Sequence, residues 1–412
     1  MLKTFFESGL AVLYSVSFCL LLAACNDSSH QTIADNAEGF PELSQLVAFS
    51  SNANSSHLAC AQHYRESCLL EQFPPLGVEK NTPLMISDIE QRLFVSHPWM
   101  AERFLSVLTT SPSSLLPLFR SVSAIVIADD VRPSFYSANT ATIYIDPRYS
   151  AGDEEEWLTI VPKDDFRDQY QVNVSFLCGS PKRRQCRHPS RSVDQRYFFR
   201  LVIIPLVTIE QLPNLALFRL LVHELAHAND LLPPSVLSSL SPKRTIYQNI
   251  TATTPLNQSL YEQLPLQDAL LFNVADVLYQ GASPSDAVSE LTAAQAGAHF
   301  ETEGASDLYS YSNRREDLAM LFQSYMMHEH WGLQDQFLFL SQNEQMTEGC
   351  ERYSVEWGQT GRMFDPLVYE RMILVAEALL EIELSVRFTV VLEATPIPSG
   401  TSWCEIINSI KG

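Results

Sequence analysis

The sequence predicts an α+β fold with a small sheet in the N-terminal half and a mainly helical C-terminal half. Two short runs, residues 124–128 and 141–145, are rich in Ile, Val, Thr and Tyr, which is typical of strands. From about residue 206 onward, the sequence is typical of helices joined by proline-containing connections. Hydrophobic residues make up 46% of the 412 residues and charged residues 18%, so the chain can bury a large core.

The charge balance argues against two classes of partner. The chain has 27 Lys and Arg against 48 Asp and Glu, which gives a formal net charge of −21. Binding to nucleic acid, or electrostatic docking on anionic lipid, needs concentrated positive charge, so we expect neither. Beyond the N-terminal segment, no apolar stretch reaches the ~20 residues that a membrane-spanning helix needs.

The N-terminal segment predicts export. Lys3 precedes an apolar run that ends in Leu-Ala-Ala-Cys at residues 22–25. A positive start and a short apolar run before small residues are typical of a signal peptide, here residues 1–25. Leu-Ala-Ala-Cys resembles the lipobox of bacterial lipoproteins, which implies that Cys25 is lipidated and anchors the protein in the cell envelope. By the same resemblance, Asn26 after the cysteine implies the outer membrane. The alternative is an ordinary signal peptide that is cut near a cysteine.

Six further cysteines predict disulfides. They are an even number in a chain expected to be exported, where disulfide bonds form and persist. Proximity in the sequence suggests the pairs Cys60–Cys68, Cys178–Cys186 and Cys350–Cys404. A structural zinc site made from Cys178, Cys186 and His188 is the alternative, although this spacing lacks a Cys-x-x-Cys pair.

Composition divides the mature chain into two parts. Residues 26–58 are rich in Ser, Asn, Ala and Asp, which is typical of a flexible tether. Together with the cysteine-closed loop that follows, they form an N-terminal segment, residues 26–80. Residues 81–412 form the main domain.

Two local patterns lie in the first half of this domain. Apolar residues at helical spacing cover residues 86–110, with an interruption expected at His97-Pro98. The predicted strands at 124–128 and 141–145 bracket a turn-rich segment, so we expect a hairpin or an edge element there.

One segment contains a metal-binding motif. Residues 223–227 read His-Glu-Leu-Ala-His, in an apolar stretch without a helix breaker before Pro233. Residues four apart lie about 6 Å apart on one helix face, so the imidazoles of His223 and His227 can bind one metal ion. Glu224 lies about 100° further round the helix, beside the ion, where a general base is required. Two surface histidines on an amphipathic helix are the alternative interpretation.

Two histidines leave this site incomplete, because catalytic zinc usually has three protein ligands. The candidates for the third ligand are Asp230, Glu316, His328 and His330. Residues 313–322 look helical and contain Glu-Asp-Leu-Ala at 316–319. The first helix with its His-Glu-x-x-His, followed by this Glu-Asp-x-Ala helix, resembles the gluzincin metallopeptidases. The resemblance covers these two helices and implies one zinc ion per chain, bound by His223, His227 and Glu316, with Glu224 as the base.

The rival ligands have other interpretations. Asp230 shares the helix face of the two histidines, but residues on one continuous helix point outward in parallel. We therefore expect it to support a ligand or to close the helix end. His330 lies 14 residues after Glu316, about 21 Å along an unbroken helix, so it and His328 compete with Glu316 instead of joining it. Glu316 also fits a capping box with Asn313.

The expected chemistry is zinc-dependent hydrolysis of a peptide bond in a peptide or protein substrate. Zinc acidifies bound water and polarises a carbonyl, while Glu224 takes the proton and passes it to the leaving amine. The oxyanion needs a further donor, for which Tyr309 and Tyr311 are candidates. Asp317 could hydrogen-bond a ligating histidine or lie on a solvated helix face. The alternatives are a zinc amidase or deacylase acting on cell-envelope material and a non-catalytic envelope lipoprotein.

Overall fold

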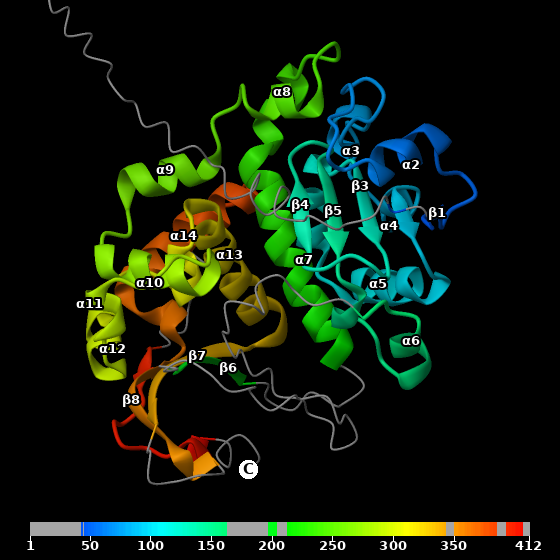
Figure 1. Cartoon of the computed structure of the whole chain (residues 1–412). Helices are drawn as coiled ribbons and strands as arrows, with labels where there is room; N and C mark the ends of the chain where they lie inside the picture. The colour runs from blue at the N-terminus through cyan, green and yellow to red at the C-terminus, as the bar shows by residue number, and fades with distance from the viewer. Residues whose placement is uncertain are drawn as a thin grey trace, which may run out of the picture. The chain divides into compact units, whose positions relative to one another are not determined.

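Two sheets and a set of helices make up the described part of the chain (Figure 1). The computed structural model describes residues 43, 45–162, 197–203, 212–342, 350–384 and 393–406. The predicted α+β class, with a small sheet in the N-terminal half and helices in the C-terminal half, is confirmed. Within these ranges, no helix is both long and apolar enough to cross a membrane. The predicted signal peptide and Cys25 lie outside the described residues.

The first sheet has five strands in the order β1-β2-β3-β5-β4. Its strands are β1 (Val47–Ala48), β2 (Leu93–Val95), β3 (Ala124–Ile127), β4 (Phe135–Ser137) and β5 (Thr142–Ile145). The central strands β2, β3 and β5 are parallel, and the outer strands β1 and β4 are antiparallel to their neighbours. Every residue of β3 and β5 is buried, which explains their continuous apolar and β-branched sequences.

Two expectations for this half need correction. The predicted strands at 124–128 and 141–145 form, but they pair in parallel and not as a hairpin. The edge element is β4, which lies between them in sequence and pairs with β5. The helical stretch expected at 86–110 contains strand β2, because a short continuous apolar run fits either period. The helix after β2 begins at Pro98, whose missing N–H costs nothing in the first turn.

Short helices surround this sheet. They are α2 (Ser55–Gln62), α3 (Leu76–Glu79), α4 (Ile86–Glu90), α5 (Pro98–Thr110) and α6 (Glu154–Leu158), with the 3-10 helices η1 (Ser113–Ser121) and η2 (Pro147–Tyr149). Leu43, Cys60, Phe73 and Leu76 are buried in the same apolar core as the sheet. The described part of the expected N-terminal segment therefore packs with the strands that follow it.

One predicted disulfide is present between described residues. Cys60 and Cys68 are bonded and close a loop with a sequence separation of 8 residues. Cys404 is also disulfide-bonded. Its expected pairing with Cys350 stays a prediction, because the side chain of Cys350 lies outside those described. The expected pair Cys178–Cys186, and with it the alternative zinc site, lies outside the described residues.

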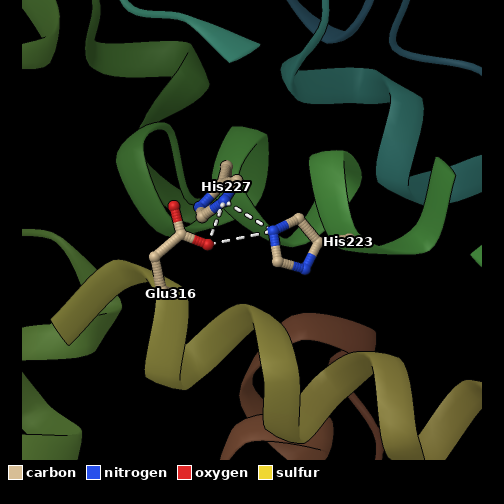
Figure 2. A group of neighbouring side chains, drawn as sticks. All are labelled: His223, His227 and Glu316. Carbon is tan, nitrogen blue, oxygen red and sulfur yellow. Dashed lines mark hydrogen bonds and ion pairs between the residues drawn. The ribbon is translucent and has the colours of Figure 1, made fainter. Parts of the chain in front are cut away.

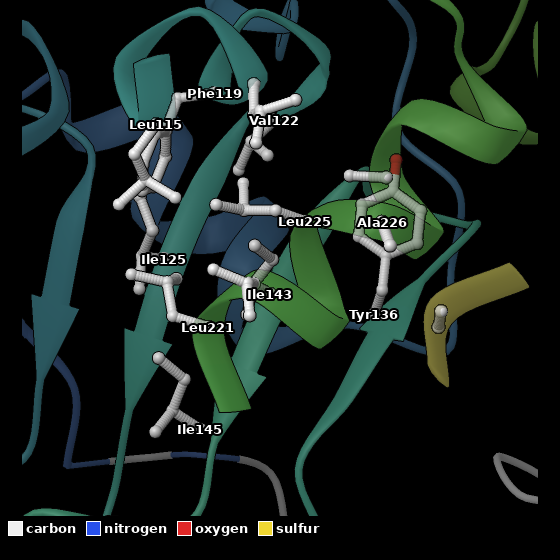
Figure 3. Close-up of a cluster of buried hydrophobic side chains, with 14 of the residues drawn as sticks. Leu115, Phe119, Val122, Ile125, Tyr136, Ile143, Ile145, Leu221, Leu225 and Ala226 are labelled. Atoms are coloured by element: carbon white, nitrogen blue, oxygen red, sulfur yellow. The ribbon is translucent and has the colours of Figure 1, made fainter. Parts of the chain in front are cut away.

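A 20-residue helix, α7 (Leu212–Leu231), packs against the first sheet. Figure 3 shows its apolar side chains beside those of the strands: Leu221, Leu225 and Ala226 lie near Ile125, Tyr136, Ile143 and Ile145. All of these side chains are buried, and full burial of one large apolar side chain contributes roughly 1.5–3 kcal/mol. This packing fixes the rotation of α7 and therefore the direction of its opposite face.

Some of the helices after α7 share the core of the first sheet, and others build a second apolar cluster. They are α8 (Ile246–Ile250), α9 (Leu256–Gln263), α10 (Ala269–Tyr279), α11 (Asp286–Ser289), α12 (Ala293–Glu301), α13 (Arg314–Trp331) and α14 (Pro366–Leu380), with the 3-10 helices η5 (Pro234–Ser239), η6 (Leu308–Tyr311), η7 (Cys350–Arg352) and η8 (Arg362–Phe364). α13 packs against α7, and α14 packs against α13 (Figure 1). This arrangement brings the first turn of α13 next to α7.

A second sheet was not expected from the sequence. It is antiparallel, in the order β6-β7-β8-β9, with strands β6 (Tyr197–Ile203), β7 (Gln334–Gln342), β8 (Tyr353–Thr360) and β9 (Thr395–Pro396). Helix α12 packs against β7 and β8, where the ring of Phe300 stacks on Phe337 at a centroid distance of 4.6 Å. Only the centre of β7 is apolar and its ends are polar, so its pattern is weak in the sequence.

Candidate metal centre

Helix α7 brings the two motif histidines together. His223 and His227 lie one turn apart, and their Nε2 atoms are separated by 3.1 Å. Their rings are nearly perpendicular, with centroids 4.8 Å apart. The leucines that flank them on the helix are buried against the sheet, so the histidines face away from it. The helical spacing predicted for this motif is therefore present.

Glu316 reaches the two histidines from α13, 93 residues further along the chain. Its Oε2 atom lies 3.0 Å from Nε2 of His223 and 3.4 Å from Nε2 of His227 (Figure 2). Asn313 caps the helix and accepts hydrogen bonds from the amides of Arg315 and Glu316. Only the Asn313 half of the expected capping box is thus present, because the Glu316 carboxylate points to the histidines and not back to the cap.

The three ligand atoms have the spacing that a metal ion requires. Tetrahedral zinc with ligands at about 2.0–2.1 Å holds them about 3.3–3.4 Å from one another. The observed separations of 3.0, 3.1 and 3.4 Å are close to this value. Within the described ranges, His223, His227 and Glu316 are the group whose ligand atoms lie together in this way. The group can hold a metal ion.

The surroundings of the Glu316 carboxylate favour its ionised form. Burial alone would raise the pKa of the Glu316 carboxyl, but the neighbouring imidazoles of His227 and His223 hold it well below its usual value. Glu316 is therefore ionised at neutral pH, as a metal ligand must be. The His223 side chain is 12% exposed, against 3% for His227 and 4% for Glu316, so the group meets solvent on the His223 side.

Glu224 lies beside this group by its place on the helix. It follows His223 on α7 and is buried. One residue corresponds to about 100° of helix rotation, which puts its carboxylate on the flank of the ligand face. Its role as the base stays a prediction.

Asp230 connects the end of α7 to the start of α9, and its predicted support of a metal ligand stays a prediction. It is fully buried at the end of α7, and its carboxylate accepts hydrogen bonds from the backbone N–H and the Nδ2 of Asn257, at 2.7 and 2.6 Å. Burial raises the pKa of Asp230, and the hydrogen bonds from Asn257 and the nearby guanidinium of Arg315 oppose that rise. Asp230 was expected to be a helix-end group. The contact agrees with this expectation, because Asp230 accepts a backbone N–H from the first turn of α9.

Asp317 has a partner that the sequence did not indicate. It is fully buried, so the expected solvated position is wrong. Its carboxylate is bonded to the guanidinium of Arg371 on α14 and not to a ligating histidine. A separation of 54 residues gives no local signal for this pair.

The other candidates are engaged elsewhere. The Tyr311 hydroxyl donates to Glu303 at 3.3 Å, which gives no support for a role at the oxyanion. Tyr309 packs edge-on against Tyr279, and its predicted role stays open. Nδ1 of His328 lies 3.3 Å from the carbonyl oxygen of Leu333. The ring of His330 packs against Phe218 and Trp331. The described group therefore contains Glu316 and neither of these histidines.

Comparison of the chain with protein-family models, with curated proteins and with solved structures found no match in any of the three. The likeness to gluzincins accordingly rests on the two helices and their three ligand residues.

Proposed function

We propose that this protein is an exported zinc-dependent hydrolase that cleaves peptide bonds. One observation carries the proposal: two histidines one turn apart and a distant glutamate converge with ligand atoms 3.0 to 3.4 Å apart. Two histidines and one glutamate form a ligand set of catalytic zinc sites. The resemblance of the motif helix and the Glu-Asp-x-Ala helix to the gluzincins supports the same assignment.

The number of ligands favours catalysis over a structural role. Structural zinc usually has four protein ligands, whereas catalytic zinc has three and an open position. Within the described ranges, no fourth His, Cys, Asp or Glu joins His223, His227 and Glu316. We place the entry of the substrate on the His223 side, where the group meets solvent.

The proposed reaction assigns a separate task to each residue. Zinc, when bound, would acidify a water molecule and polarise the substrate carbonyl. His223, His227 and Glu316 hold the metal position, and the charge of Glu316 partly neutralises it. Glu224 accepts the proton and delivers it to the leaving amine.

We propose that the lipobox-like segment ending at Cys25 anchors the enzyme in the bacterial cell envelope, with the outer membrane favoured.

Metal content and hydrolysis test the proposal separately. Purified wild type should contain about one zinc per chain, and His223→Ala should lose it. Glu224→Gln should keep the zinc and lose hydrolysis of a fluorogenic peptide library. Full peptidase activity of Glu224→Gln would refute the mechanism. Zinc retention with activity only on amides of cell-envelope material would favour the amidase alternative, and a metal-free wild type would favour a non-catalytic lipoprotein.

A further inference from the structure

Glu316 occupies a part of its helix that needs external support. It is the third residue of α13, which begins at Arg314. Residues of the first turn lack a preceding helical turn beneath them, and helix ends open most easily. The position of the Glu316 carboxylate therefore depends on what holds this turn in place.

Asn313 and Asp317 both help to hold this turn. Asn313 ties the amides of Arg315 and Glu316 from the N-terminal side. Asp317, the next residue, is bonded through both carboxylate oxygens to the guanidinium of Arg371, with Nη1 and Oδ1 3.1 Å apart. A two-point bond between guanidinium and carboxylate fixes orientation as well as distance. Asp317 is fully buried and the Arg371 side chain is 3% exposed, so solvent does not screen the pair.

Arg371 is itself held in a fixed place. Its Nε donates to the carbonyl of Leu264 at 2.8 Å and its Nη1 to the carbonyl of Gly304 at 3.0 Å. A Cβ atom at Gly304 would lie 2.5 Å from Cδ of Arg371 and 2.8 Å from the carbonyl oxygen of Leu367. Glycine at 304 thus permits the close approach of α14, and the guanidinium connects the end of α9, the 304 loop and the first turn of α13.

One of the two histidines lacks a described support of the usual kind. Metal-binding histidines usually donate their second ring N–H to a carboxylate or a carbonyl. Nδ1 of His223 is buried and has no hydrogen-bond partner among the described residues. The described contacts therefore support Glu316 from outside the ligands, and they do not support His223 in this way. A buried ion pair adds little net stability compared with apolar residues of similar size, so stability alone gives a weak reason for this pair.

We propose that Asp317 and Arg371 are positioning residues for the metal ligand Glu316, which they hold through the first turn of α13. The inference rests on the metal site of the proposed function. It predicts that weakening the pair lowers metal affinity beyond what a general loss of stability explains.

Arg362 provides a matched control. It is also buried, and it donates to the carbonyls of Phe300, Glu303 and Ala305, in the same segment that Arg371 contacts. Its remaining described hydrogen bond goes to Gln359. Arg362 therefore supports the 300–305 segment without a described hydrogen bond to α13.

The test compares Arg371→Lys with Arg362→Lys in the mature full chain, together with Asp317→Asn. Zinc affinity is measured by competition with a chelating dye. The free energy of unfolding of each metal-free variant is measured in urea. Lysine cannot make the two-point bond, so Arg371→Lys and Asp317→Asn should weaken zinc binding about 10–100-fold. Arg362→Lys should stay within about threefold of wild type even if it loses similar stability. The absorption spectrum of the Co²⁺-substituted protein should change for Arg371→Lys and Asp317→Asn and stay unchanged for Arg362→Lys.

Three results separate the possible errors. Wild-type affinity in a folded Arg371→Lys protein would overturn the inference and leave the metal site standing, and this variant decides the test if Asp317→Asn does not fold. An equal loss in Arg362→Lys would also overturn it, because the effect would then be general loosening. A wild type that binds no zinc would overturn the proposed function itself.

Discussion

Replacement of Glu316 by glutamine tests the assignment of the third ligand most directly. The amide has nearly the same size as the carboxylate, and the Asn313 cap uses backbone groups that the substitution leaves in place. The change therefore removes the charge that lies 3.0 and 3.4 Å from the two histidine Nε2 atoms while the helix is retained. A neutral amide is a poor zinc ligand in a site built from imidazole and carboxylate.

The expected loss can be estimated from the number of ligands. Structural zinc sites with four ligands bind with about 10–16 kcal/mol, or roughly 2.5–4 kcal/mol per ligand. Removal of one ligand from this centre should therefore weaken zinc binding roughly 10²–10³-fold. Competition with a chelating dye at neutral pH measures this change, and elemental analysis gives the stoichiometry.

The matched control is His328→Ala, which removes a rival ligand proposed from the sequence. His328 packs its ring against Phe364, outside the described metal group, so its loss should leave zinc affinity within about threefold of wild type. The reasoning would be refuted by the opposite pattern, in which Glu316→Gln keeps its zinc and His328→Ala releases it.

Three further outcomes follow from individual contacts. In the metal-free protein, the lowered pKa of Glu316 stabilises the fold at pH values above the usual pKa of about 4.5, and this stabilisation is lost as the pH falls through the lowered pKa. Urea unfolding at several pH values should show this loss of stability, and the loss should be smaller in Glu316→Gln. Gly304→Ala puts a Cβ 2.8 Å from the carbonyl oxygen of Leu367, so it should cost about 1–3 kcal/mol in the same assay. Replacement of Cys60 and Cys68 by serine opens a loop with a sequence separation of 8, and loop entropy gives a loss of about 2.5 kcal/mol in the free energy of unfolding. An unchanged denaturation midpoint would contradict either of the last two.

The sequence was most informative where the physics is local. The spacing of His223 and His227 depends only on the helical repeat, and their Nε2 atoms lie 3.1 Å apart. The strands β3 and β5 were also visible as apolar, β-branched runs. Their parallel pairing was not, because strand direction depends on the chain that connects the strands and not on the strand residues themselves.

Contacts between segments that are far apart in the chain could not be predicted from the sequence. No residue near Asp317 in the sequence indicates that it pairs with Arg371. A helical carboxylate that is solvated and one that is buried have the same local sequence pattern, because burial depends on the helix that packs against them. The pairing of β6 with β7 likewise joins segments more than 100 residues apart. Glu316 could be proposed only through the resemblance to a family, since its distance from the histidines in sequence carries no physical signal.

The proposed metal centre depends on two kinds of order. Helix α7 alone would present His223 and His227, but two ligands would give a weak site. Glu316, the proposed third ligand, lies beside them because α13 packs against α7, and we propose that Asn313 and the pair of Asp317 with Arg371 hold the first turn of α13 in place. A bound ion would in turn join these two helices and stabilise their packing in proportion to its affinity. Metal affinity would therefore measure how well the tertiary structure around α13 is formed. The five residues 223–227 of the motif alone give no information on that structure.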